Sequence, residues 1–431
     1  MRISYYALGC KVNEYEATAI INRFIEEGYE LVDFHNEADV CIINTCTVTA
    51  SADAKSRKLI RQAIRRNPNG VIAIMGCYSQ LRSKVDDFPE VDIIIGTKDR
   101  HLLFDLIIKA QQEKQNYYHI ENINIVKNYE ELKINRYNNR TRGFVKIEDG
   151  CDNFCSYCAI PYARGRVRSR KPEDVINEIK RLTNSGSREI VLSGINTAAY
   201  GKDLINYQFS NLLEDIFTKI PELGRIRISS IEITEITDEL LDVLSKYKNH
   251  FCDHFHIPLQ GGTNKILSLM NRKYQLNDYE QKINKIRTLF PTVNITTDIM
   301  VGFPGESDYD FQEGKDFIER MAFGEMHVFP FSIRPGTRAE ELSNQISNEI
   351  KKERVKALLA LNDKQSLRYR MFFEGKDLDV IVEKMILGVG YGHSANYIGV
   401  NFNGNDINLN QNYKIRVTKA SYPISRGEII V

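Results

Sequence analysis

The 431-residue sequence has almost no net charge, with 58 basic and 57 acidic side chains. A strongly basic overall field is therefore absent, and any site for a nucleic acid must come from local clustering. No apolar run is long enough to span a bilayer. The first residues also lack the apolar core and cleavage site of a secretory signal. The sequence therefore predicts a cytoplasmic protein with no membrane partner.

The lack of an export signal bears on the 8 cysteines. Cytosolic thiols stay reduced, so metal ligation is a better interpretation than disulfide formation. Six of the cysteines fall into two groups of three. Cys41 and Cys252 lie within or beside predicted strands, and we interpret both as structural residues.

The first hundred residues alternate short apolar runs with amphipathic stretches. Strands are expected at residues 3–8, 40–43, 71–75 and 91–95, and helices at 14–26 and 52–66. This alternation predicts a Rossmann-like α/β domain with a parallel sheet. Cys10, Cys46 and Cys77 each follow one of these strands, at the edge where open α/β sheets bind ligands. We expect the three thiols to meet there, where they could hold an iron–sulfur cluster with one open iron.

A second series of alternating strands and helices follows a polar segment. Its six strands are expected at residues 143–147, 189–193, 225–229, 254–257, 294–301 and 326–329. This pattern predicts a partial (βα)6 barrel, and a long charged helix at 347–370 follows it. Short β-type runs separated by Gly and Asn then predict a small all-β barrel. The expected divisions are a first domain at 1–112, a linker at 113–139, a central domain at 140–370 and a β-barrel at 371–431.

The most informative segment contains Cys151, Cys155 and Cys158, with the spacing C-x3-C-x2-C. Three thiolates on one loop can each ligate one iron of a 4Fe-4S cluster, which leaves the fourth iron open to a small molecule. A closed structural zinc site or a closed cluster needs four ligands, and no fourth cysteine is nearby. An open cluster is favoured, and a zinc knuckle is the alternative.

This spacing resembles that of radical S-adenosylmethionine (SAM) enzymes. The resemblance implies a βα barrel in which the open iron binds SAM, whose one-electron cleavage yields a 5′-deoxyadenosyl radical. Further expected SAM contacts are an aromatic residue beside the third cysteine and polar groups at the ends of two barrel strands. These are Tyr157, Ser193, Gly194, Asn196 and Glu232. Ordinary loop packing and strand-end capping are the alternatives for them.

The order of the two cysteine groups, with a terminal β-barrel, resembles the methylthiotransferase family over essentially the whole chain. The β-barrel resembles the RNA-binding TRAM domain. The matching stretches are LGCKVN (8–13), NTC (44–46), GC (76–77), DGCDNFCSYC (149–158), IPYARG (160–165), SSIE (229–232), HIPLQGG (256–262), MNRKY (270–274) and TDIMVGFPGE (297–306).

The first and eighth of these stretches are most similar to the branch that acts on N6-threonylcarbamoyladenosine in tRNA. The resemblance implies methylthiolation of C2 of that base, beside the anticodon, with SAM and two 4Fe-4S clusters as cofactors. It also implies an electron donor and a sulfur donor as partners. Other branches act on isopentenyladenosine in tRNA or on a ribosomal protein. A different class of function is a non-catalytic iron–sulfur protein that binds RNA.

Two basic clusters fit an RNA substrate. Arg164, Arg166, Arg168 and Arg170 follow the cysteine loop and would share one face of an extended segment. The second cluster lies on the helix expected at 52–66, where a solvated charged face is nearly as good an interpretation. The sequence departs from the family at Arg166 and Gly261. The β-barrel segment carries six basic and six acidic residues, so charge does not favour RNA binding there.

Overall fold

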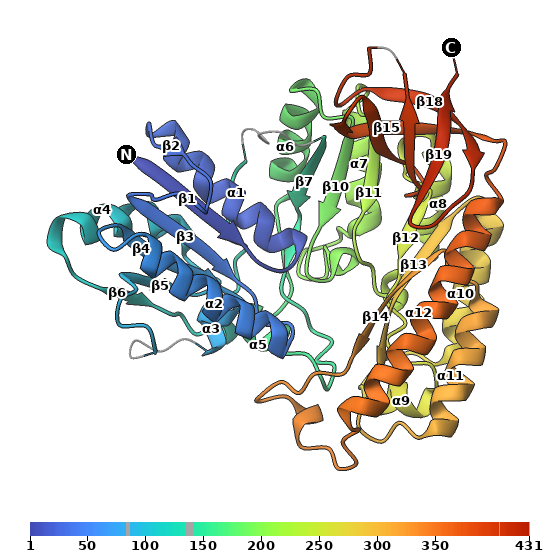
Figure 1. The fold of residues 1–431 in the computed structure, drawn as a ribbon, viewed down its shortest axis with the longest axis horizontal. Coiled ribbons are helices and arrows are strands. Elements are labelled where there is room, and N and C mark those ends of the chain that lie inside the picture. Colours follow the sequence, from blue (N-terminus) through green and yellow to red (C-terminus); the bar gives the residue numbers. More distant parts are fainter. Residues whose placement is uncertain (83–86, 135–140, 405, 431) are drawn as a thin grey trace. The chain divides into compact units, whose positions relative to one another are not determined.

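The computed structural model describes residues 1–82, 87–134, 141–404 and 406–430 (Figure 1). The chain divides into two compact units. Unit 1 contains residues 1–137, 146–171 and 332–340, and unit 2 contains residues 138–145, 172–331 and 341–431. Part of the predicted linker, residues 135–139, lies outside the described residues. Among the described helices, none is both long enough and apolar enough to cross a membrane.

Unit 1 is an α/β unit around one six-stranded sheet. Its elements are β1 (Arg2–Ala7), α1 (Lys11–Glu26), β2 (Glu30–Leu31), β3 (Val40–Thr45), α2 (Ala50–Arg66), β4 (Val71–Gly76), α3 (Cys77–Arg82), β5 (Ile93–Ile95), η2 (Arg100–Leu102), α4 (Leu103–Glu113), β6 (Tyr117–His119), η3 (Ile123–Ile125), β8 (Glu148–Asp149), α5 (Ile160–Arg164), β9 (Arg168–Ser169) and η7 (Arg338–Glu340).

The six-stranded sheet is parallel, with the order β2-β1-β3-β4-β5-β6. Alternate side chains of β3 pack on opposite faces. Val40 and Ile42 pack in a core with α1 and α4, whereas Cys41 and Ile43 pack in a core with α2 and α3. The predicted parallel α/β domain is therefore confirmed, and Cys41 lies in its core. The strand order places the topological switch between β1 and β3, where doubly wound sheets bind ligands.

Unit 2 contains a curved sheet covered by helices, and a closed barrel. Its elements are β7 (Arg142–Lys146), α6 (Pro172–Asn184), β10 (Glu189–Ser193), η4 (Thr197–Ala199), α7 (Phe209–Lys219), β11 (Arg225–Ile228), η5 (Ile233–Glu235), α8 (Asp238–Lys246), η6 (Lys248–His250), β12 (His254–His256), α9 (Asn264–Leu269), α10 (Leu276–Leu289), β13 (Asn294–Val301), α11 (Asp308–Met321), β14 (Glu325–Pro330), α12 (Asn348–Met371), β15 (Asp377–Ile386), β16 (Val389–Ser394), β17 (Gly399–Asn403), β18 (Asn412–Lys419) and β19 (Ile424–Ile429).

The six strands expected for the central barrel are all present. They form the sheets β11-β10-β7 and β12-β13-β14. A parallel bridge between Ser230 and His256 joins the two sheets, so together they make one curved six-stranded wall. This is the predicted partial barrel.

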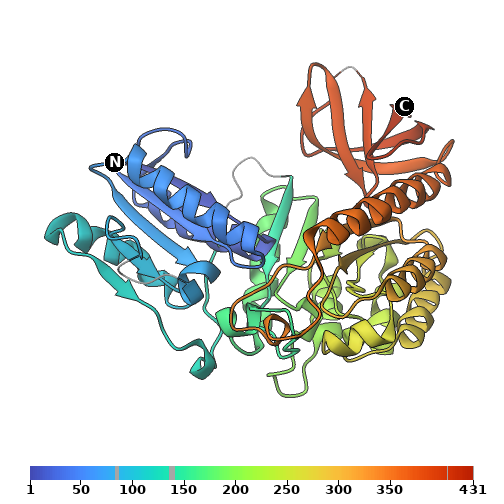
Figure 2. The same cartoon turned by 60° about the horizontal axis from the view of Figure 1, so that its bottom comes forward.

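The chain passes from the partial barrel to the closed barrel through α12, and Figure 2 shows this helix leading into the C-terminal strands. Asn362 fixes α12 to the wall, since its side chain accepts a hydrogen bond of 2.7 Å from the backbone N–H of Met326. The closed barrel has the order β15-β16-β17-β19-β18, around a core that includes Val380, Val400 and Ile415. The predicted small all-β barrel is confirmed.

Candidate iron–sulfur centres

The first three cysteines lie at one edge of the sheet of unit 1. Cys10 is the N-cap residue of α1, Cys46 directly follows β3, and Cys77 is the first residue of α3. The strands that precede them, β1, β3 and β4, are neighbours in the sheet. Because parallel strands end on the same side, the three thiols share this edge, as the sequence predicts.

The packing brings the loops of Cys10 and Cys46 close together. The Cα of Gly9 is so close to Cys46 that an added Cβ would lie 2.6 Å from its sulfur. Burial raises the pKa of the Cys77 thiol to about 12, and the neighbouring Cys46 and Cys10 thiols act in the same direction. The three thiols are therefore near enough to influence one another at this edge of the sheet.

Asparagine and threonine side chains of the adjacent motifs hold these loops together. Asn13 donates hydrogen bonds to the carbonyl oxygens of Leu8 (2.7 Å) and Thr45 (3.0 Å). Asn44 in turn donates to the carbonyl oxygen of Asn13 (2.8 Å). The Thr45 hydroxyl donates to the carbonyl oxygen of Met75 (2.6 Å). The β1, β3 and β4 ends are thus tied to one another beside the thiols.

The buried guanidinium of Arg164 adds a cation to this site. Its Nε lies 3.2 Å from the Cys77 sulfur, and its terminal nitrogens bind Glu16 (2.8 and 3.0 Å), Asp149 (3.0 Å) and Asn13 (2.6 Å). Burial raises the pKa of Glu16, but Arg100, Arg164 and Lys146 outweigh this and hold it well below its usual value. A guanidinium beside a thiolate stabilises the charged form that binds iron.

The second cysteine group belongs to the same compact unit. Cys151, Cys155 and Cys158 lie on the loop between β8 and α5, and all three are partly exposed. The loop is held by hydrogen bonds of 3.0 Å from the Cys151 N–H to the Gly165 carbonyl and from the Cys158 N–H to the Cys155 carbonyl. Burial raises the pKa of the Cys151 thiol, and Cys158 and Cys155 act in the same direction. The three thiols therefore lie on one short loop and are near enough to influence one another.

A glycine makes this loop possible. Gly150 precedes Cys151 with φ +87°, and an added Cβ would lie only 1.9 Å from the carbonyl oxygen of Arg166. No other residue fits this close approach of two backbone segments. The start of the cysteine loop is therefore fixed against the segment that follows α5.

Both donor sets fit 4Fe-4S clusters. Each has three thiols, which leaves one iron without a cysteine ligand. The residues that would hold the clusters are Cys10, Cys46 and Cys77 in one set and Cys151, Cys155 and Cys158 in the other. The Arg164 N–H that faces the Cys77 sulfur is a contact expected of a metal-bound thiolate. The remaining cysteines, Cys41 and Cys252, are fully buried and belong to neither set.

The residues expected to contact SAM lie in both units. Tyr157 is a half-buried residue of the cysteine loop in unit 1. In unit 2, Ser193 ends β10 and donates to the Val145 carbonyl (3.3 Å). Gly194 and the buried Asn196 follow it directly.

Glu232 differs from the other expected contacts because it already has a cationic partner. Its carboxylate lies 2.6 Å from the guanidinium of Arg272 and also accepts from the Ile233 N–H (3.2 Å). Burial raises the pKa of Glu232, and Arg272 opposes this shift. Arg272 comes from the MNRKY stretch, so two of the family-like motifs meet here.

The arginine run does not form the predicted phosphate-binding face, and this part of the sequence interpretation is wrong. Arg164, Arg168 and Arg170 are 0%, 3% and 1% exposed. The segment is not extended throughout, because Arg164 ends α5 and Arg168 begins β9. Arg168 lies 3.6 Å from Asp149, and Arg170 pairs with Glu131. Buried guanidinium groups with carboxylate partners cannot reach a phosphate.

Arg166 is the exception in this run. Its side chain is 64% exposed and lies 3.4 Å from Asp152, over the ring of Phe154. It therefore remains available at the surface beside the cysteine loop.

The structure also shows a titratable group that the sequence interpretation missed. Asp298 on β13 lies 3.3 Å from His256 on β12 and 3.3 Å from His327 on β14. Burial raises the pKa of Asp298, but the hydrogen bonds with the two histidines hold it below its usual value. Such a group can store a proton or bind a divalent cation. The signal in the sequence was a histidine or an aspartate within each of three consecutive predicted strands.

Comparison with known protein families agrees with both halves of this arrangement. Residues 145–318 match the Radical SAM superfamily, and residues 2–96 match the uncharacterized protein family UPF0004. A cobalamin-binding radical SAM methyltransferase from Kitasatospora setae, TsrM, has a similar fold. Its TM-score is 0.58 at 15% identity, over 78% of this chain and 76% of that one.

The similarity to curated proteins extends over the whole chain. The threonylcarbamoyladenosine tRNA methylthiotransferase MtaB of Bacillus subtilis is 42% identical, over 99% of this chain and 96% of that protein. The protein of the same name from Aquifex aeolicus is 37% identical, over 89% and 93%. The tRNA-2-methylthio-N(6)-dimethylallyladenosine synthase of B. subtilis is 33% identical, over 98% and 84%. This chain therefore belongs to the radical SAM tRNA methylthiotransferase family.

Proposed function

We infer that the chain catalyses the radical SAM methylthiolation of C2 of N6-threonylcarbamoyladenosine, beside the anticodon of tRNA. The observation that carries this conclusion is the presence of two three-thiol sets in one compact unit. A single set would serve SAM cleavage alone. The second set offers a place for the sulfur that is transferred.

The reaction explains why such cofactors are needed. The C2–H bond of adenine is unactivated, and neither an acid–base pair nor a metal hydroxide replaces it at neutral pH. Bound clusters and SAM supply one-electron chemistry and a site for sulfur, whereas the protein supplies binding, orientation and exclusion of water. In unit 1, the residues that provide this orientation are Asn13, Asn44 and Thr45, which hold the three cysteine loops in register.

Further contacts are part of the same proposal. We propose that Tyr157, Ser193, Gly194 and Asn196 contact SAM. We propose that Glu232 accepts a hydrogen bond from a hydroxyl group of SAM. A carboxylate has about four acceptor sites, so it can do this while it is paired with Arg272. We also propose that the TRAM-like barrel of residues 371–431 contacts RNA. The proposed domains before it are residues 1–112 and 140–370, with a linker at 113–139. A separate electron donor and sulfur donor act with the protein in the cytoplasm.

The choice of substrate rests on the relative similarities. Identity is 42% to the threonylcarbamoyladenosine enzyme of B. subtilis and 33% to its dimethylallyladenosine counterpart. The carboxylate that the threonylcarbamoyl group adds distinguishes the two bases chemically. N6-threonylcarbamoyladenosine is therefore the proposed substrate.

Nucleoside mass spectrometry of tRNA from cells with and without this chain tests the proposal. We expect 2-methylthio-N6-threonylcarbamoyladenosine to disappear and its unthiolated precursor to accumulate. A change confined to the isopentenyladenosine derivative would assign the other tRNA branch. If both tRNA nucleosides stayed unchanged, the ribosomal-protein and non-catalytic alternatives would replace the proposal.

A further inference from the structure

The helix α2 has two chemically different faces. Its buried face includes Ser56, whose hydroxyl donates to the Cys46 carbonyl (3.0 Å) and accepts from the Cys46 N–H (3.2 Å). Asp53, one turn earlier, accepts from the Thr47 hydroxyl (2.6 Å) and from Arg334 (2.7 Å). The helix is therefore fixed to the loop that carries a cysteine of the first set.

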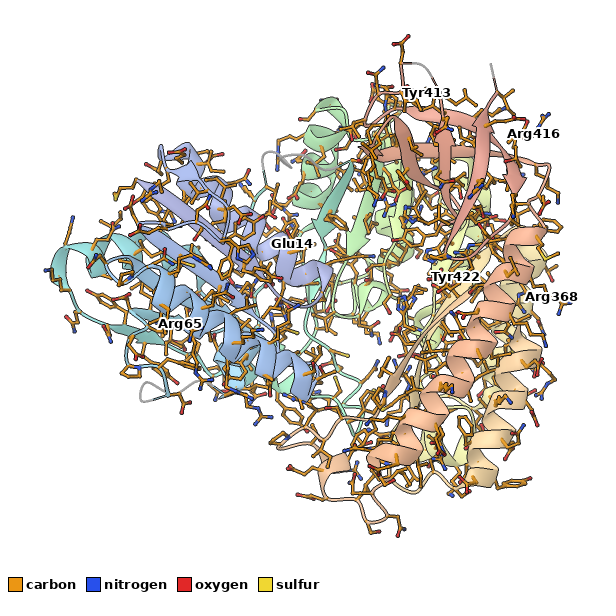
Figure 3. All side chains as sticks on the ribbon, viewed as in Figure 1. Glu14, Arg65, Arg368, Tyr413, Arg416 and Tyr422 are labelled. Atoms are coloured by element: carbon orange, nitrogen blue, oxygen red, sulfur yellow. The ribbon has the colours of Figure 1, made fainter. Side chains whose placement is uncertain are left out.

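The opposite face of α2 is basic and exposed. Lys55, Lys58, Arg61 and Arg65 are all exposed, and helical geometry places them within an arc of about 120°. The stripe runs about 15 Å along the helix. Figure 3 labels Arg65 near the C-terminal end of α2. A shallow hollow of about 510 Å³ lies beside it and is lined by Lys58, Gln62, Arg65 and Arg66.

The charges of this stripe are not neutralised within the described structure. Among the described residues, no ion pair involves Lys55, Lys58, Arg61 or Arg65. The one acidic residue of α2, Asp53, is buried and bound to Arg334. The buried arginines after the cysteine loop have carboxylate partners instead. Of the two basic clusters in the sequence, only the cluster on α2 presents a row of uncompensated charges to solvent.

We propose that the face of α2 formed by Lys55, Lys58, Arg61 and Arg65 binds the phosphodiester backbone of the substrate tRNA. This inference rests on the proposed function. Charge complementarity favours RNA, since successive phosphates match a row of cations with no acidic residue among them. The helix is only about 10 Å thick, so phosphates bound on its outer face lie at a fixed, short distance from the Cys46 loop. Phosphate binding there positions the RNA for reaction without distinguishing its base sequence.

The test measures how tRNA binding to the full-length, cluster-loaded protein depends on salt. The probe is tRNA purified from cells that lack this chain. The variant Lys58→Gln/Arg61→Gln/Arg65→Gln removes three charges and keeps good helix formers. We expect the slope of log K against log salt to become shallower by about 2 to 3. Affinity at physiological salt falls on the order of tenfold to a hundredfold.

A matched control removes the same net charge elsewhere. Lys219, Lys246 and Lys364 are exposed but each pairs with its own carboxylate, at 3.0, 2.7 and 3.1 Å. The triple Gln variant at these positions should keep the wild-type slope. The charge-preserving variant Lys58→Arg/Arg61→Lys/Arg65→Lys should also keep it, which separates charge from folding.

The outcomes are distinct. An unchanged slope in the α2 Gln variant, or an equal loss in the control, overturns the inference and leaves the proposed function in place. If the wild-type protein itself fails to bind this tRNA, the proposed function fails. SAM cleavage to 5′-deoxyadenosine without RNA should be equal in all variants, because these side chains lie outside the thiol sets.

Discussion

The Nε of Arg164 lies 3.2 Å from the sulfur of Cys77. The same guanidinium binds Asp149, which lies two residues before Cys151 of the second cysteine set. Arg164 thereby connects a thiol of one set to the start of the loop that carries the other. It is fully buried, so solvent screens its charge less than it would at the surface.

Replacing Arg164 by Lys should lower the reduction potential of the cluster at Cys10, Cys46 and Cys77. The substitution keeps the positive charge but removes the N–H that faces the Cys77 sulfur. Hydrogen bonds to ligand sulfurs stabilise the reduced, more negative cluster. Potentiometric titration followed by electron paramagnetic resonance measures the shift, in a background with Cys151, Cys155 and Cys158 changed to Ala.

Arg100 provides the control for this measurement. It pairs with the same carboxylates, Glu16 (2.5 Å) and Asp149 (3.8 Å), and with Glu130. In the described part of the chain, none of its contacts is to a thiol. Arg100→Lys should leave the potential unchanged. Equal shifts in both variants would show that the ion network acts as a whole, against a specific role of the Arg164–Cys77 contact.

The two thiol sets predict the iron content of cysteine variants. The intact protein should bind about eight iron atoms per chain, as two 4Fe-4S clusters do. Cys46→Ala and Cys155→Ala should each retain about four. Cys41→Ala and Cys252→Ala serve as controls, because these residues are buried outside both sets. Iron analysis after anaerobic reconstitution measures these contents. A loss of iron in the two control variants would contradict the assignment of the six cluster ligands.

Gly150→Ala should destroy the second set without touching a cysteine. The new Cβ would lie 1.9 Å from the Arg166 carbonyl oxygen, and the φ of +87° adds strain. We expect loss of about four iron atoms per chain and of SAM cleavage.

Gly186→Ala separates these two causes. Gly186 has a similar φ of +95° but nothing within 4 Å of the added Cβ. It should lose only about 1–2 kcal/mol of stability through backbone strain and keep its iron. Iron loss in this variant as well would show that a general loss of stability, rather than the close approach at Gly150, is responsible.

A buried carboxylate should make the stability of unit 2 depend on pH. Glu189 lies between Arg142 (3.1 Å), Arg225 (2.7 Å) and Arg227 (2.7 Å). Burial raises its pKa, but the three guanidinium groups outweigh this and hold it below the usual 4.5. The pKa of Glu189 is lower in the folded state than in the unfolded state. Its contribution to folding stability is therefore full above about pH 4.5 and is lost as the pH falls further.

Glu189→Gln should therefore destabilise the protein at neutral pH by about 3–5 kcal/mol, because it leaves buried arginines without their partner. Its melting temperature should approach that of the wild type as the pH falls below about 4. Glu214→Gln, which breaks the exposed pair with Lys246, should change stability by less than about 1 kcal/mol. A pH-independent difference between Glu189→Gln and the wild type would contradict the account.

The sequence was sufficient to predict the arrangement of the cysteines. Cys10, Cys46 and Cys77 follow neighbouring parallel strands, and strand direction alone brings such positions together. The partial barrel was also predictable, because its strands are apolar runs separated by helices. Periodicity carries this information because it reports burial directly.

The burial of the arginines after the cysteine loop could not be predicted from the sequence. Arg164 and Arg170 owe their burial to Glu16 and Glu131, which are remote in sequence. The partners of a buried charge depend on tertiary packing, which no local pattern encodes. The same holds for Glu232, whose partner Arg272 lies 40 residues further along the chain. The very short strands β2 (Glu30–Leu31) and β6 (Tyr117–His119) were missed because, unlike β5, they do not lie in an apolar run.

A reaction with purified components tests the proposed methylthiolation itself. The cluster-loaded protein is mixed anaerobically with SAM, a reductant and tRNA that contains N6-threonylcarbamoyladenosine, and the nucleosides are then analysed by mass spectrometry. We expect this base to exchange one hydrogen for one methylthio group. The Cys46→Ala variant should still cleave SAM but leave the base unchanged. SAM cleavage by the intact protein without any change in the base would contradict the proposed reaction.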